Sequence, residues 1–196
     1  MKASHPKEKR LKSWIDRALS PLCRLMISLK IQPNLVSLAG VLITLMVPVE
    51  TLRENGVGAG LWLLAAGFFD VLDGSLARNS GLQGPFGAFW DSTLDRISEA
   101  FVFGGFLLYY GQHQELSNLL LAFCVCILSL LVSYTRARAE GLGIECEVGV
   151  LPRPGRVVLL ALGLMLGRLS WALVVVGILS LVTVIQRIHR VLSLAV

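Results

Sequence analysis

Six apolar runs dominate this sequence and limit the folds that it can adopt. They cover residues 33–52, 59–77, 86–110, 116–136, 155–168 and 169–189. A helix that crosses the hydrocarbon core of a bilayer needs about 20 apolar residues. The fifth and sixth runs together are tight for two crossings, and a turn is expected between them at Gly167-Arg168. The chain is 55% hydrophobic and 16% charged, whereas soluble domains have about 25% charged residues. We therefore predict an all-α integral membrane protein with six transmembrane helices.

An amphipathic segment precedes the first run. From Leu11 to Leu29 apolar residues recur at helical spacing, with charged residues between them. This pattern is typical of a helix that lies in the membrane interface with its apolar side towards lipid. A helix docked onto a partner is the alternative. We expect residues 1–30 to form a cytoplasmic N-terminal part with this interfacial helix, and residues 31–196 to form one six-helix transmembrane domain.

Basic residues are concentrated at alternate connections between the runs. Eight of the eighteen Lys and Arg residues precede residue 31, whereas the connections after the first, third and fifth runs hold only Arg53 and Arg168. The positive-inside rule then places both termini in the cytoplasm, in a multi-pass protein of the cell membrane. The net charge of +5 fits cytoplasmic loops near anionic headgroups, so no nucleic-acid partner is expected.

Four aspartates interrupt the second and third runs or lie beside them. They are Asp70, Asp73, Asp91 and Asp95. A carboxylate in the membrane is costly unless it is paired or faces water, so a functional role is the first interpretation. The i,i+3 and i,i+4 spacings place each pair on one face of a helix. Because the connection Asn79–Gly84 is short and rich in glycine, we expect the two helices to be antiparallel neighbours and the four carboxylates to converge near the cytoplasm.

Converging negative charges repel strongly at low dielectric, so something must compensate them. Ion pairs with Arg78 and Arg96 would leave two of the four carboxylates unpaired, whereas two divalent cations would balance all four. Hard oxygen ligands in this number suit Mg²⁺, Mn²⁺ or Ca²⁺. A cation-coupled membrane transporter is the rival interpretation, because buried carboxylates also mark ion pathways.

Glycines around the aspartates favour an enzyme over a transporter. Gly74 directly follows Asp73, and three more glycines lie between the two pairs of aspartates. Residues without a Cβ let a phosphate or nucleotide approach the backbone closely. Arg78, one turn after Gly74, offers a guanidinium to phosphate oxygens. Carboxylates, metal, glycine and arginine together are typical of a phosphoryl-transfer centre.

Residues 70–95 resemble the signature of the CDP-alcohol phosphotransferase family. The pattern D-x2-D-G-x2-A-R-x8-G-x3-D-x3-D is met at every fixed position. These positions are Asp70, Asp73, Gly74, Ala77, Arg78, Gly87, Asp91 and Asp95. The six-helix topology and the interfacial N-terminal helix also resemble the family, so the likeness extends over nearly the whole chain.

The resemblance implies the reaction and the roles of the matched residues. The four aspartates would bind Mg²⁺ or Mn²⁺, two ions per subunit, and Asp95 would also deprotonate the acceptor hydroxyl. The donor would be CDP-diacylglycerol or a CDP-linked ether lipid, and the enzyme would be a homodimer that releases CMP. The residues implied to contact the CDP-lipid are Pro33, Asn34, Leu35, Val36, Gly74, Arg78 and Gly84.

A second group of basic residues bears on the acceptor. Arginines at one membrane level could hold a phosphorylated alcohol, although ordinary positive-inside charge is the alternative. The layout resembles the phosphatidylinositol-phosphate synthase branch, including its archaeal ether-lipid relatives, which implies that Arg136, Arg156 and Arg187 bind the phosphate of inositol phosphate. Arg136 stands where a lysine is common in that branch. Glycerol 3-phosphate, the acceptor of phosphatidylglycerophosphate synthases, remains the alternative acceptor.

Overall fold

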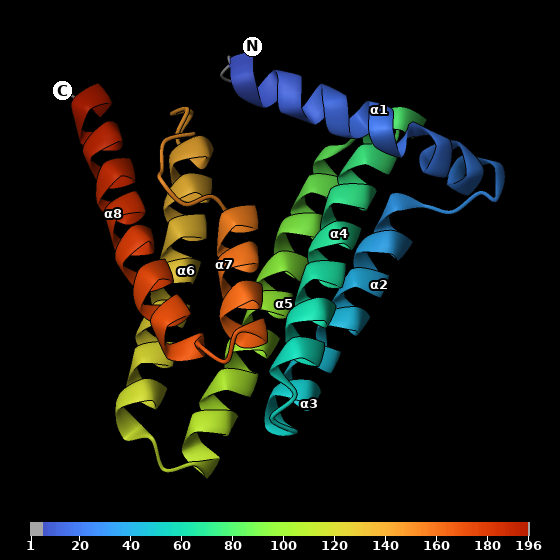
Figure 1. Ribbon diagram of the computed structural model, residues 1–196. Coiled ribbons are helices and arrows are strands. Elements are labelled where there is room, and N and C mark those ends of the chain that lie inside the picture. The colour runs from blue at the N-terminus through green and yellow to red at the C-terminus, as the bar shows by residue number, and fades with distance from the viewer. Residues whose placement is uncertain (1–5, 196) are drawn as a thin grey trace.

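The structure is a computed structural model that describes residues 6–195, with side chains from residue 14 to residue 194. The described chain forms eight helices (Figure 1). In chain order they are α1 (Pro6–Ser28), α2 (Pro33–Thr44), α3 (Met46–Leu52), α4 (Gly56–Ser80), α5 (Pro85–Gln112), α6 (Leu116–Gly141), α7 (Arg153–Met165) and α8 (Leu169–Ala195). The predicted all-α class is confirmed.

Four segments of the described chain are long and apolar enough to cross a membrane. They are Pro33–Leu52, Gly56–Ser80, Leu116–Gly141 and Leu169–Leu194. α5 has 28 residues but carries four charged side chains: Asp91, Asp95, Arg96 and Glu99. α7 has 13 residues and rises about 20 Å at 1.5 Å per residue, less than the hydrocarbon core of about 30 Å. The multi-pass membrane class is confirmed, and the count of six spanning helices stays a prediction.

The first apolar run is one membrane segment made of two helices. α2 ends at Thr44 and α3 begins at Met46. Pro48 lies in α3 and has no N–H, so the carbonyl of Thr44 loses the donor four residues ahead. The helix is therefore interrupted at Leu45, where sequence periodicity predicted one continuous run.

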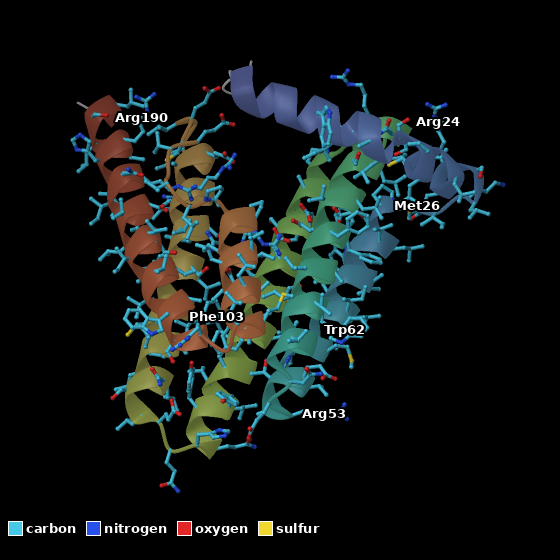
Figure 2. All side chains as sticks on the ribbon, in the orientation of Figure 1. Arg24, Met26, Arg53, Trp62, Phe103 and Arg190 are labelled. Atoms are coloured by element: carbon cyan, nitrogen blue, oxygen red, sulfur yellow. The ribbon has the colours of Figure 1, made fainter. Side chains whose placement is uncertain are left out.

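The helices pack as a bundle with a buried apolar centre. α2 packs against α4 and α5, α7 packs against α4 and α8, and α6 packs against α5 and α8. Phe103 and Phe106 on α5 are almost fully buried and lie edge to face, together with Val125 and Leu173 from the helices around them. Figure 2 labels Phe103 within this centre.

α1 lies across one end of the bundle and packs against α4 (Figure 1). Cys23 is fully buried against Leu72 and Leu76, whereas Trp14 and Leu25 are more than half exposed. The predicted helix is confirmed, and it has one apolar side docked and another exposed. Its seat in the membrane interface stays a prediction.

Two ends of the bundle are distinguished by their charged residues. Arg24 and Arg190 lie at the end that carries α1, and Arg53 lies at the opposite end (Figure 2). The C-terminal end of α8 shares the end of α1 (Figure 1), as the positive-inside pattern predicts for the two termini. The turn between the fifth and sixth runs is also confirmed, because α7 and α8 flank Gly167, whose φ is 63°.

Candidate active site

The chain reverses direction between the two halves of the aspartate motif. Gly81 has a φ of 70° and ends α4 in the left-handed conformation that glycine adopts without strain. Gly84 precedes α5, and Pro85 fills its first helical position. The two helices are therefore antiparallel, as the sequence predicts. They do not pack directly against each other over their described lengths, because α2 packs against both of them.

A cavity of about 300 Å³ lies between these helices, α2 and α7. All four aspartates of the signature line it, and so do Glu99 on α5 and two arginines on α7. The remaining wall is mostly apolar and includes Val41, Leu63 and Phe103. The cavity is thus charged where the aspartates lie and apolar where it extends into the bundle.

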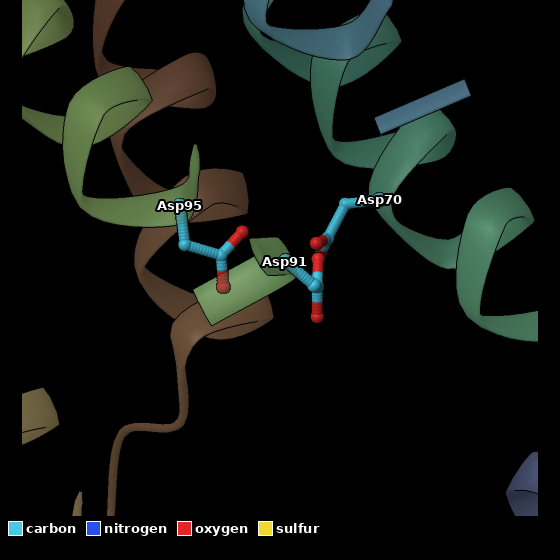
Figure 3. Close-up of side chains that lie close together, drawn as sticks. All are labelled: Asp70, Asp91 and Asp95. Atoms are coloured by element: carbon cyan, nitrogen blue, oxygen red, sulfur yellow. The ribbon is translucent and has the colours of Figure 1, made fainter. Parts of the chain in front are cut away.

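Three of the four predicted metal ligands come together in this cavity. One carboxylate oxygen from each of Asp70, Asp91 and Asp95 lies within 4.8 Å of the others (Figure 3). Asp70 projects from α4, whereas Asp91 and Asp95 project from successive turns of α5. The i,i+4 spacing therefore has the predicted effect, and the group brings carboxylates from both helices to one point.

Asp73 borders the same cavity but lies outside that close group. It is 4% exposed, and its Oδ2 has no hydrogen-bond partner among the described residues. A buried carboxylate oxygen without a donor is costly unless a cation or another group satisfies it. Four oxygen-bearing side chains around one cavity are the ligand chemistry of Mg²⁺ or Mn²⁺, so the residues present fit a divalent metal.

Arginines compensate part of this negative charge. Nη1 of Arg153 lies 2.8 Å from Oδ1 of Asp70 and 2.6 Å from Oδ1 of Asp95. Arg96 lies 3.6 Å from the other oxygen of Asp95. The sequence prediction left Arg153 out of the site. Its position three residues before Arg156, on the same helix face, was the available signal.

Among the residues predicted to contact CDP, Gly74 and Arg78 lie together. A Cβ on Gly74 would be 3.3 Å from Nη1 of Arg78. Arg78 does not pair with the aspartates of the signature; it binds Asp16 of α1 instead, with Nη2 2.8 Å from Oδ1. Asp16 is a second residue that the sequence prediction did not include. Its only signal was an acidic residue in a basic amphipathic helix.

The other predicted CDP contacts lie at helix starts. Gly84 has open space around its Cα, because a Cβ on this residue would have no heavy atom within 4 Å. The segment Pro33, Asn34, Leu35 and Val36 forms the first turn of α2. Val36 is buried and Leu35 is exposed. Ser37, the next residue, lines the cavity.

The three predicted acceptor arginines have different surroundings. Arg156 lines the cavity and is 2% exposed. Arg187 is also buried, but it donates to the backbone carbonyls of Val132 and Val148. Arg136 is exposed and pairs with Glu140 at 2.9 Å. Only the first of the three borders the cavity, so their shared role in holding an acceptor stays a prediction.

A buried polar group connects three helices beside the carboxylates. Nη2 of Arg156 lies 3.2 Å from Oε1 of Glu99, which also accepts a hydrogen bond from Ser129. Nε and Nη1 of Arg156 have no hydrogen-bond partner among the described residues. Glu99 was not predicted, although it lies one turn beyond Asp95. The cavity thus contains a guanidinium with free donors next to the aspartate group.

Known proteins are similar to this chain in sequence and in fold. The profile of the family described as CDP-alcohol phosphatidyltransferase matches residues 30–186. An archaetidylinositol phosphate synthase of Pyrococcus horikoshii is 33% identical over 182 residues, which are 92% of this chain and 94% of that protein.

Two crystal structures of a phosphatidylinositol phosphate synthase of Mycobacterium tuberculosis have a similar fold and are 26% identical in sequence. One, with CDP-DAG bound, has a TM-score of 0.81 and covers 89% of this chain and 94% of that chain. The other, in complex with manganese and citrate, has a TM-score of 0.80 and covers 87% of each chain. The chain therefore belongs to the CDP-alcohol phosphatidyltransferase family and is a CDP-alcohol phosphotransferase whose aspartate group suits a divalent metal.

Proposed function

We propose that this enzyme transfers a phosphatidyl or related lipid phosphate group from a CDP-lipid to a hydroxyl of inositol phosphate, with release of CMP. The observation that carries this proposal is a cavity that holds four carboxylates and, beside them, the guanidinium groups of Arg153 and Arg156. Carboxylates with a divalent metal suit the pyrophosphate of the donor. Arginines suit an acceptor that carries a phosphate of its own. The names of the similar proteins support the same acceptor.

The aspartates would perform the metal-dependent part of the reaction. Asp70, Asp73, Asp91 and Asp95 would hold two divalent ions, Mg²⁺ or Mn²⁺. When bound, these ions neutralise the pyrophosphate and stabilise CMP as a leaving group. Asp95 would take the proton from the acceptor hydroxyl. The acceptor oxygen then bonds to the phosphorus that carries the lipid, and the bond from that phosphorus to CMP breaks, with the electron pair leaving on CMP.

The nucleotide end of the donor would lie over the first part of the signature. Gly74 and Gly84 leave room for close approach, and Arg78 would bind phosphate oxygens. The first turn of α2, from Pro33 to Val36, would complete the contacts to the nucleotide. The helix N-terminus there presents backbone N–H groups without partners inside the helix, which favours an anionic ligand.

The acceptor phosphate would bind at the other side of the carboxylates. Arg156 has two nitrogens free for an anion, and it lies on the cavity wall. Arg136 and Arg187 would contribute by exchanging their present partners for the phosphate. The cavity would open to the cytoplasm, because the end of the bundle with α1 carries the predicted cytoplasmic charge. A homodimer in the cell membrane completes the proposal.

The test uses purified full-length protein in detergent with CDP-diacylglycerol or its ether-lipid counterpart, Mn²⁺ and one acceptor at a time. The acceptors are inositol 1-phosphate, glycerol 3-phosphate, free inositol and serine, and the readout is CMP release together with the mass of the lipid product. We expect turnover with inositol phosphate and little with free inositol. Turnover with glycerol 3-phosphate alone would overturn the acceptor, and no CMP release with any acceptor would overturn the reaction.

A further inference from the structure

Helix α1 contacts the signature through one carboxylate. Asp16 accepts hydrogen bonds from Nε of Arg78 at 2.9 Å and from Nη2 of Arg78 at 2.8 Å. The hydroxyl of Ser75 donates a third hydrogen bond to Asp16 at 2.7 Å. Two parallel bonds between a guanidinium and a carboxylate fix the plane of the guanidinium as well as its position.

These contacts leave one nitrogen of Arg78 for another ligand. Nη1 is not used by Asp16, and it lies 3.3 Å from the position that a Cβ on Gly74 would take. Nη1 therefore lies close above Gly74, the signature glycine one turn before Arg78 on α4. Hydrogen bonding from Arg78 also keeps the pKa of Asp16 below its usual value, so this carboxylate is charged at neutral pH.

α1 has a separate means of attachment to α4. Cys23, Leu72 and Leu76 form a buried apolar cluster with Leu19 and Met26 packed against it. The members of this cluster that belong to α1 follow Asp16 in sequence, within the same helix. Removing the charge of Asp16 therefore leaves the apolar attachment of α1 in place.

We infer that Asp16 is a positioning residue for the nucleotide site: it holds the Arg78 guanidinium in the orientation that binds the phosphates of the CDP-lipid. This inference rests on the proposed role of Arg78. A long arginine side chain that is already fixed loses less rotamer freedom when its ligand binds. The contact also connects the position of α1 to donor binding, because Asp16 lies in α1 and Arg78 lies in α4.

Asp16→Asn is the direct test, because it keeps the shape of the side chain and removes its charge. The readouts are the KM for CDP-lipid, the KM for the acceptor, kcat, and the Kd of CDP itself for full-length protein with Mn²⁺. We expect the KM for CDP-lipid and the Kd for CDP to rise about tenfold. The KM for the acceptor should stay within about twofold, because the proposed acceptor site lies at Arg156 and not at Arg78. Asp16→Glu should recover part of the loss.

Two further variants separate positioning from a general structural effect. In an Arg78→Gln background, Asp16→Asn should add no further loss of CDP affinity, because residues that act as one unit are not additive. Arg24→Ala, which removes the α1 side chain bonded to Ser20, should leave the affinity for CDP unchanged.

Three results would overturn the inference. The first is that Asp16→Asn binds CDP as well as the parent. The second is that it binds CDP more tightly, which would mean that Asp16 competes with phosphate for Arg78. The third is that Asp16→Asn weakens CDP binding by the same factor in the Arg78→Gln background as in the parent. If the parent protein binds CDP and Asp16→Asn binds it with the same Kd, only the positioning role is refuted. A parent protein that binds no CDP refutes the proposed function as well.

Discussion

Arg153 and Asp95 form a close ion pair, with Nη1 2.6 Å from Oδ1, inside the group of carboxylates that suits a metal. The same nitrogen lies 2.8 Å from Asp70 on the facing helix. The guanidinium of Arg153 thus connects α4, α5 and α7 at the point where the carboxylates lie closest together. Its charge stabilises the aspartates and also competes with a divalent ion for their oxygens.

Replacing Arg153 by Gln should therefore tighten metal binding. Without the competing guanidinium, we expect the Kd for Mn²⁺ to fall about tenfold, which corresponds to about 1.4 kcal/mol. The metal-free protein should lose about 1–3 kcal/mol of unfolding free energy, because Asp70 and Asp95 lose a partner. Titration of Mn²⁺ by electron paramagnetic resonance measures the first effect, and denaturant unfolding in micelles measures the second.

Arg96→Gln is the matched control for that variant. Arg96 also pairs with Asp95, but at 3.6 Å and without contact to Asp70. The control removes the same amount of charge from the neighbourhood. Because Arg96 lies farther from the carboxylate oxygens than Arg153 does, its removal should change the Kd for Mn²⁺ less. Equal effects of the two substitutions would mean that Arg153 acts only as a distant charge, and weaker Mn²⁺ binding in Arg153→Gln would contradict the competition outright.

Asp95→Asn should lower turnover strongly even when metal is saturating. Loss of a general base costs about 10²–10⁴ in rate. CMP release from CDP-lipid and inositol phosphate is measured over a range of Mn²⁺ concentrations, with Asp70→Asn alongside. High Mn²⁺ should restore part of the activity of Asp70→Asn, because that side chain is proposed as a ligand alone. If Mn²⁺ restores Asp95→Asn equally well, the role of Asp95 as a base is wrong.

The ion pair between Arg156 and Glu99 should be important for stability. Glu99→Gln leaves a guanidinium that is 2% exposed without an anionic partner, and such a loss costs about 3–5 kcal/mol. The double substitution Glu99→Leu with Arg156→Met should cost less than Glu99→Gln, because no charge stays buried. Both free energies come from unfolding in micelles.

A surface pair provides the comparison for that measurement. Glu140→Gln removes the partner of Arg136 in an exposed i,i+4 pair, and exposed pairs contribute at most about 1 kcal/mol. A loss in Glu99→Gln no larger than this would show that the buried pair is solvated in the membrane protein.

Two adjacent glycines test the packing of α5 on α3. A Cβ on Gly105 would lie 2.6 Å from Cβ of Pro48, whereas a Cβ on Gly104 would have no heavy atom within 4 Å. Gly105→Ala should therefore force the helices apart and cost about 1–3 kcal/mol. Gly104→Ala should be neutral or stabilising, by up to about 1 kcal/mol of helix propensity. Equal stability of the two variants would contradict the close approach of α3 and α5.

The sequence predicted the features that depend on local spacing. The i,i+4 pair Asp91 and Asp95 shares a helix face as expected, the glycine-containing connection reverses the chain, and the turn after α7 lies at Gly167. Periodicity also predicted the helix α1. In each case a few neighbouring residues determine the geometry, so no knowledge of the rest of the fold is needed.

Features that depend on packing between distant segments were not predicted. Arg153 meets Asp95 across 58 positions of sequence only because α7 packs on α4 beside α5. Arg78 was predicted to bind phosphate oxygens of the CDP-lipid, and the sequence did not show that α1 brings Asp16 to it across 62 positions. The separation of α4 from α5 likewise follows from α2, which packs against both. The local signals at Arg153 and Asp16 do not indicate which distant residue each side chain meets.

The central claim is that the aspartates of α4 and α5 form a divalent metal site, and equilibrium Mn²⁺ binding to the full-length protein tests it most directly. The double variant Asp70→Asn with Asp91→Asn should bind Mn²⁺ on the order of 100-fold more weakly than the parent, since loss of ligands costs at least as much as loss of their supporting groups. Glu54→Gln changes a residue just before the start of α4, far from the aspartates in that helix, and should bind Mn²⁺ as the parent does. Unchanged Mn²⁺ binding in the double variant would contradict the account.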